Sequence, residues 1–267
     1  LKNTGWYPGI FGQIGKTGVI KNVAFVDLTH NGSGGAIITG AVGKVENVLV
    51  TGKMTGNNSK ALFGNNLNYN FPHTKDITVI ATEAPAGTHN RVISRWEGFG
   101  QISGTLVAIG AGDESKLCGL ADIAAITANN ANIKPYLTAA DAAADTTLTE
   151  NGSVTFKRVN GALGVEWNGV HVYGAELILD ATAYDYSLSN KTIDLTKIPE
   201  LSGKTVNSIT YEDGTVIPFT VSNSVITIGD DTKDILDAVA TTATGVTTKV
   251  VLTTASGKYY LPLTVCT

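Results

Sequence analysis

A short pattern of glycine, apolar and asparagine residues recurs along the first part of the chain. The string GIFGQIGKTGVIKNV occupies residues 9–23, and the related string GAIITGAVGKVENV occupies residues 35–48, so that Asn22 recurs as Asn47. Looser copies begin at Ala61 and at Phe99. A repeat period in the twenties is typical of a solenoid, in which each coil buries its apolar face only against its neighbours.

The repeat also predicts which side chains face inward. Strands alternate inward apolar and outward polar residues, and the inward set is expected to be Ile20, Val23, Phe25, Val45, Val48 and Val50. Asn22 and Asn47 lie at the corner of their coils, where asparagine tolerates the left-handed backbone region and bonds nearby backbone groups. A charge placed at Val48 is therefore expected to disturb the whole stack.

These two strings resemble the GLUG repeat, whose copies combine a glycine-rich apolar turn with Ile-x-Asn-Val. The resemblance covers about residues 1–110, and the third and fourth copies depart from the pattern. It implies a right-handed parallel β-helix in secreted or surface-attached bacterial proteins, including adhesin-like chains and non-catalytic parts of large surface peptidases. It implies no catalytic residues. Because the chain opens directly into a glycine-rich repeat with no evident cap, we expect further coils upstream of residue 1.

The composition shifts towards alanine between Gly112 and Glu150. We expect a last irregular coil there, followed by a short helix for which Thr138 and Asp141 form a start signal. The first domain is therefore expected to span residues 1–150, with residues 111–150 acting as cap and linker.

Eight short alternating runs follow between Ser153 and Val265 and predict a β-sandwich over residues 151–267. Turn signals separate them at Asn160-Gly161, Asn168-Gly169, Asp213-Gly214 and Ser256-Gly257. The last pair of runs resembles the final hairpin of bacterial immunoglobulin-like modules, a resemblance that covers residues 185–267. The block 151–180 is either an extra hairpin layer or the closing strands of the first domain. The predicted fold class is thus all-β, a right-handed parallel β-helix plus an immunoglobulin-like sandwich.

Charge and motif content argue against several function classes. Only 16% of the 267 residues are charged and the net charge is −4, so there is no basic excess for nucleic-acid binding. No apolar run is long enough for membrane insertion. The four histidines, His30, His73, His89 and His171, show no zinc-ligand spacing, and no serine nucleophile motif is present. We therefore expect no enzymatic activity and no cofactor within this chain.

Two groups of residues remain as candidate ligand sites. Trp6, Tyr7, Trp96 and Trp167 are candidates for stacking on sugar rings if they are exposed, although burial is the commoner state of such residues. The acidic run that contains Asp230, Asp231 and Asp234 offers oxygen ligands for calcium, although a helix N-cap accounts for the same residues.

The sequence thus predicts a non-catalytic surface module of an exported bacterial cell-surface protein, acting in adhesion, ligand binding or spacing. Its expected location is extracellular, and its expected partner is a host or cell-surface glycan or protein. Two alternatives stay open: an accessory region of a large secreted peptidase or glycan-active enzyme, and a phage virion surface or tail protein.

Overall fold

The computed structural model describes residues 9–229 and 247–266, apart from gaps at 16, 33, 42, 57–60, 67–72, 95–101 and 120–121. The chain is mostly β-structure. It divides into two compact units, Leu1–Glu176 and Leu177–Thr267, and each is described by itself.

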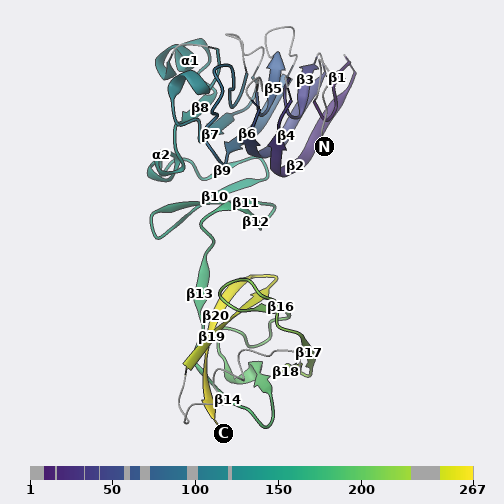
Figure 1. Cartoon of the computed structure of the whole chain (residues 1–267), viewed down its shortest axis with the longest axis vertical. Helices are drawn as coiled ribbons and strands as arrows, with labels where there is room; N and C mark the ends of the chain where they lie inside the picture. Colours follow the sequence, from purple (N-terminus) through teal and green to yellow (C-terminus); the bar gives the residue numbers. More distant parts are fainter. Residues whose placement is uncertain are drawn as a thin grey trace. The chain divides into compact units, whose positions relative to one another are not determined.

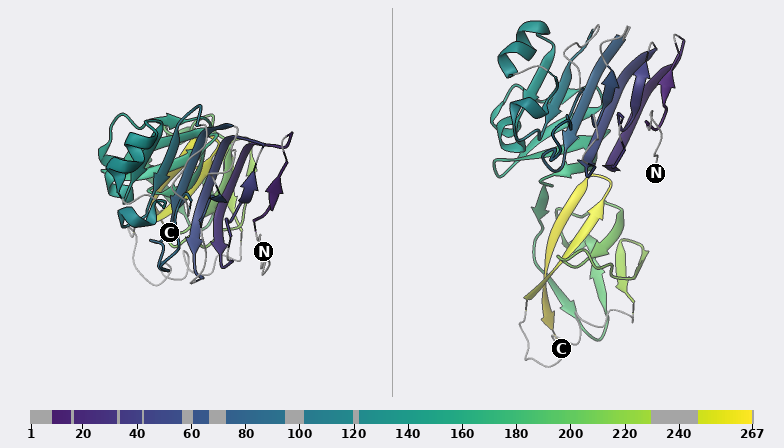
Figure 2. Two further views of the ribbon diagram at one scale, coloured as in Figure 1. Left: turned by 90° about the horizontal axis from the view of Figure 1, so that it is seen from above. Right: turned by 45° about the horizontal axis from the view of Figure 1, so that its top comes forward.

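The first unit is built on two parallel sheets whose strands alternate along the chain (Figure 1). The longer sheet has the order β2 (Val19–His30), β4 (Lys44–Met54), β6 (His73–Ala81), β7 (Leu106–Ile109) and β8 (Ile133–Tyr136). The shorter sheet has the order β1 (Gln13–Ile14), β3 (Ile38–Ala41) and β5 (Gly64–Asn66). This arrangement confirms a parallel β-solenoid of about three turns, and β7 and β8 extend its longer sheet (Figure 2).

Side chains stack in register inside this solenoid, as the repeat predicted. Val23 pairs in register with Val48, Val48 with Ile77, and Ile77 with Leu106. Val48, Ile77 and Leu106 are fully buried, and all six predicted inward residues belong to the core cluster or pack against it. Burying each such side chain contributes about 1.5 to 3 kcal/mol before entropy is subtracted.

The outer face of the longer sheet is buried as well. It is covered by α2 (Ala139–Ala144) and by an antiparallel sheet of β9 (Glu150–Asn151), β10 (Val154–Val159), β11 (Ala162–Trp167) and β12 (Val170–Gly174). Outward Leu49, Val107 and Ile109 pack there against Phe156 and Val165. Burial on both faces explains why all four residues of β7 are apolar, since such strands lack polar alternation.

The covering sheet extends the first unit beyond its predicted end. The predicted boundary lies after residue 150, whereas the compact unit continues to Glu176. Residues 151–176 therefore belong to the first unit, as closing strands of it, because β10 and β11 bury their apolar side chains on the solenoid.

Local signals correctly predicted two of the turns and one helix. Asn160-Gly161 and Asn168-Gly169 have positive φ at both residues, and they join β10 to β11 and β11 to β12 as the two-residue turns they predict. Thr138 and Asp141 form a reciprocal capping box at the start of α2. A second helix, α1 (Ile123–Asn129), begins at an Asp122 cap and was not predicted.

The second unit contains two sheets around one hydrophobic cluster. One has the order β13 (Ile178–Asp180), β20 (Gly257–Cys266), β19 (Thr247–Thr254) and β16 (Val206–Thr210), with β14 (Tyr184–Ser187) also paired to β20. The other has the order β15 (Thr192–Asp194), β18 (Val225–Ile228) and β17 (Phe219–Ser222). Inward residues of both sheets, among them Ile193, Ile226, Leu252 and Leu261, share the cluster.

Candidate functional site: the first turn of the solenoid

Most of the residues predicted as ligand sites lie outside the described part of the chain. This holds for Trp6, Tyr7 and Trp96 among the aromatic residues, and for Asp230, Asp231 and Asp234 in the acidic run. Their roles in carbohydrate and calcium binding therefore stay predictions.

Trp167 is the described member of the aromatic set. It ends β11, is half-buried, and packs against the apolar cluster on the outer face of the solenoid. The ring therefore contributes to packing, and its contact with a sugar stays a prediction.

Within the described residues, no group of three or more His, Cys, Asp or Glu side chains is arranged to hold a metal ion. Among the helices of that same part of the chain, none is long and apolar enough to cross a membrane.

A column of residues in the left-handed backbone region runs along one corner of the solenoid. Asn22, Asn47 and Asp76 have φ values of 54°, 51° and 53° and occupy matching positions in β2, β4 and β6. The Asn47 Nδ2 atom donates to Asn22 Oδ1 over 2.9 Å. The prediction that the two asparagines adopt this conformation is confirmed, and Asp76 is the third member, in the looser third copy.

The turn between β9 and β10 is clamped onto this column. Ser153 donates its backbone N–H to Asn47 Oδ1 over 2.7 Å and accepts from Asn47 Nδ2 over 2.8 Å. The buried Asn151 side chain donates to the Ile77 carbonyl over 2.9 Å. Gly152 lies between them with φ of 60°, and a Cβ atom there would meet the Asn47 side chain. The column thus fixes the covering sheet to the solenoid.

The solenoid is covered at its β8 end. Helix α1 packs beside β8, and its Ile126 is fully buried in the solenoid core (Figure 1). Near this end, Arg158 donates to the carbonyls of Ala143 and Leu148, which secures the end of α2. Hydrogen bonds from Thr147, and from the Tyr136 hydroxyl, lower the pKa of Asp145 to about 2.

The opposite end, formed by the first turn of the solenoid, exposes apolar side chains. We define the first turn as residues 9–15 with β2. Four of its apolar side chains are substantially exposed: Ile10 at 37%, Phe11 at 47%, Val19 at 51% and Val26 at 39%. Phe11 contacts half-buried Phe25 edge-on, with ring centroids 5.9 Å apart. Because these four exposed apolar side chains all belong to the first turn, we take the first turn as the candidate functional surface.

The edge strand β2 also carries an irregularity and two charges. Its pairing with β4 shifts between Phe25 and Leu28, and Asp27 lies in the shift with φ of 54° and donates its backbone N–H to Thr51 Oγ1. The side chains of Lys21 and Asp27 are exposed. Bulges and charges of this kind protect an edge strand against indiscriminate pairing.

His30 is the last residue of β2 and thus ends the first turn. Its side chain is buried, and its Nε2 atom lies 2.7 Å from the Gly34 carbonyl oxygen. Burial lowers the pKa of the imidazole, because desolvation disfavours the charged form.

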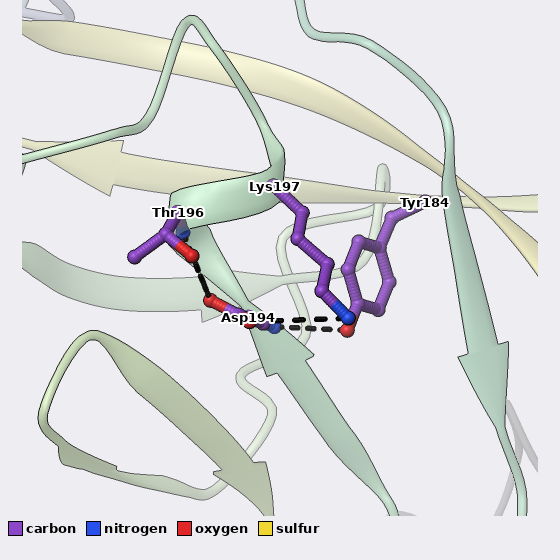
Figure 3. A network of polar contacts seen from close by, with 4 residues as sticks. All are labelled: Tyr184, Asp194, Thr196 and Lys197. Atoms are coloured by element: carbon purple, nitrogen blue, oxygen red, sulfur yellow. Dashed lines mark hydrogen bonds and ion pairs between the residues drawn. The ribbon is translucent and has the colours of Figure 1, made fainter.

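The second unit contains a compact polar network around Asp194 (Figure 3). Asp194 Oδ1 accepts from the Thr196 hydroxyl and backbone N–H over 2.6 and 3.0 Å, and the Asp194 N–H donates to the Tyr184 hydroxyl. The Thr196 hydrogen bonds lower the pKa of the Asp194 carboxyl. Since Asp194 is the N-cap of η2 (Leu195–Lys197), the network caps this helical turn.

Comparison with known proteins gives no relative for either unit. No protein-family model matches the chain, and searches of curated proteins and of solved structures returned no significant match.

Proposed function

We propose that the chain is a non-catalytic surface module of an exported bacterial cell-surface protein, acting in adhesion or ligand binding. In this proposal the first turn binds the partner and the rest of the solenoid serves as a spacer. The observation that carries the binding role is the first turn, where Ile10, Phe11, Val19 and Val26 expose apolar surface while α1 covers the other end. Exposed apolar clusters are costly for solubility, and they are typical of surfaces that meet a partner.

The finer fold assignments belong to the same proposal. The paired Asn22 and Asn47 in matching coil positions support a GLUG-type repeat and, with it, a right-handed solenoid. For the second unit, the parallel pairing of β14 with the last strand and the three-stranded sheet β15-β18-β17 support an immunoglobulin-like sandwich.

The proposed partner is a host or cell-surface glycan or protein, with an extracellular location. The net charge of −4 supports this choice over nucleic acid, since it repels phosphates.

A binding experiment with matched variants tests the proposal. The chain would be immobilised and probed with a glycan array and a panel of purified extracellular proteins, this chain included. The variant F11S/V26S removes two exposed apolar side chains of the first turn, and V216S removes an equally apolar side chain, 66% exposed, from the second unit. We expect F11S/V26S to weaken binding at least tenfold and V216S to leave it unchanged. Absence of binding by the original chain, or an equal loss in both variants, would refute the binding role.

A further inference from the structure

We propose that β17, an edge strand of the second unit, binds an extended segment of another protein as an added antiparallel strand. The segment carries apolar residues at alternate positions and lysine or arginine at its C-terminal end. This surface is separate from the first turn, so the inference goes beyond the proposed function. Its basis is the regularity of β17, the direction of its backbone groups and the charge beside it.

The strand β17 lacks the features that protect other edge strands. Bulges, charges and proline residues are the usual means of preventing pairing with another chain. Among the described edge strands of four or more residues, β2, β12 and β16 are interrupted by register shifts, and β8 and β14 contain a charged residue. The strand β17 has the sequence FTVS and pairs with β18 without interruption. A regular, uncharged edge of this kind is a template for a further strand.

The backbone groups of Phe219 and Val221 point to the open side of β17. Hydrogen-bonded and non-hydrogen-bonded pairs alternate along an antiparallel ladder. Ile228, which faces Phe219, donates its N–H away from β17, to the Lys191 carbonyl over 2.9 Å. The pairs at Phe219 and, two residues on, at Val221 are therefore the non-hydrogen-bonded ones, and no described strand pairs with this side. Donors and acceptors at strand spacing match the backbone of a polypeptide rather than a glycan.

The side chains of the same two residues favour apolar partners. Phe219 and Val221 face the side of their sheet on which Ile228 and Ile226 are buried in the hydrophobic cluster. Phe219 packs against that cluster, whereas Val221 is 46% exposed. Thr220, between them, is exposed on the opposite side. A segment with apolar residues opposite Phe219 and Val221 would extend the cluster and cover Val221.

Two carboxylates select the charge of the segment. Glu212 and Asp213 lie in a turn closed by the hydrogen bond from the Tyr211 N–H to the Thr215 carbonyl. Residues 216–218 join this turn to the start of β17 and span at most about 10 Å. Both acidic residues are exposed, and within the described residues neither forms an ion pair. The C-terminal end of an antiparallel segment lies on this side, so a basic residue there is favoured.

A labelled peptide tests the added strand. The probe is the fluorescein-labelled peptide Thr-Val-Thr-Val-Thr-Lys-Lys, titrated with the full chain and followed by fluorescence anisotropy. V221P removes one outward N–H and keeps the ladder to β18, because proline is tolerated where the N–H faces away from the sheet. V221T is the matched control, since it keeps this N–H and a branched side chain. We expect V221P to weaken binding at least about tenfold and V221T to change it less than about twofold.

Two further comparisons separate backbone pairing from charge. Methylation of both valine amides of the peptide should abolish binding, whereas methylation of its central threonine amide, which faces away from β17, should not. E212Q/D213N should weaken binding at least about threefold at low salt, and the difference should vanish at high salt. The control E150Q/D180N removes two exposed carboxylates elsewhere and should bind like the original chain.

Several outcomes would overturn the inference, provided that circular dichroism shows each variant to be folded. They are absence of binding by the original chain, an equal loss in V221P and V221T, and an equal loss with both methylated peptides. Unchanged binding by E212Q/D213N would overturn the basic end of the segment. A dimer of the original chain that V221P abolishes, detected by sedimentation velocity, would make the partner a second copy and overturn its assignment to another protein.

The variant F11S/V26S distinguishes this surface from the first turn. It should bind the peptide like the original chain, and a loss of binding would overturn the assignment to β17. The proposed role of the first turn can fail while F11S/V26S still binds the peptide, so the two proposals stand or fall separately.

Discussion

Asn47 is the residue on which the corner column and the covering sheet both depend, and replacing it by alanine tests that role. The substitution removes three side-chain hydrogen bonds, one to Asn22 and two to Ser153. Each contributes about 1 kcal/mol net. The strain of a Cβ atom at φ of 51° is common to asparagine and alanine, so the hydrogen bonds set the difference. We expect N47A to lower the free energy of unfolding of the first unit by about 3 kcal/mol.

Tryptophan fluorescence in a urea titration is the appropriate assay. The three tryptophans, Trp6, Trp96 and Trp167, all lie in the first unit, so the signal reports that unit alone. A loss of this size corresponds to a fall in melting temperature of about 10 °C for a unit of this length.

Two companion variants separate the contributions. N47G loses the same hydrogen bonds but has no Cβ atom to strain at this φ, so it should cost about 1 to 2 kcal/mol less than N47A. N22A, at φ of 54°, loses the one hydrogen bond that Asn22 accepts from Asn47, so it should cost about 1 kcal/mol. If N47A were no more destabilising than N22A, the clamp through Ser153 would not stabilise the unit and the reasoning would fail.

Three further substitutions probe the core, the clamp and a buried imidazole. V48D should abolish cooperative unfolding of the first unit in fluorescence melts, since it buries an unpaired charge, whereas V48A should cost about 2 to 3 kcal/mol. G152A should destabilise the unit more than G161A in urea titrations, because both glycines have positive φ but only Gly152 abuts Asn47. The lowered pKa of His30 means that the unfolded chain binds the proton more readily; stability should therefore fall as the pH drops below about 6.5. H30Q should flatten that pH dependence.

The solenoid could be predicted because its determinants are local. The repeated apolar positions, the corner asparagines and the Asn-Gly turns each act within a few residues, and the structure confirms the solenoid, the positive φ of Asn22 and Asn47, and the turns at Asn160 and Asn168. The capping box of Thr138 likewise depends on only four consecutive residues, 138–141.

Other features could not be predicted, because they depend on contacts between distant residues. The alternation in β10 and β11 indicates an apolar face but does not say which surface covers it, so both placements of residues 151–180 stayed open from the sequence. The short strands β14 and β15 were missed because three or four residues carry too little periodicity. The exposure of Val26 follows from the position of β2 at the edge of its sheet, which no local pattern encodes.

The clamp between Asn47 and Ser153 sets an order of events during synthesis of the chain. Neighbouring coils pair over 25 to 30 residues, so each can dock on its predecessor soon after it leaves the ribosome. Ser153, however, is 106 residues beyond Asn47. At about 5 to 20 residues per second, the second coil must wait roughly 5 to 20 s for the turn that locks it. During that interval the apolar outer face at Leu49 is uncovered. Chaperones, or the polar residues at the corners of the solenoid, must then keep the nascent chain from aggregating.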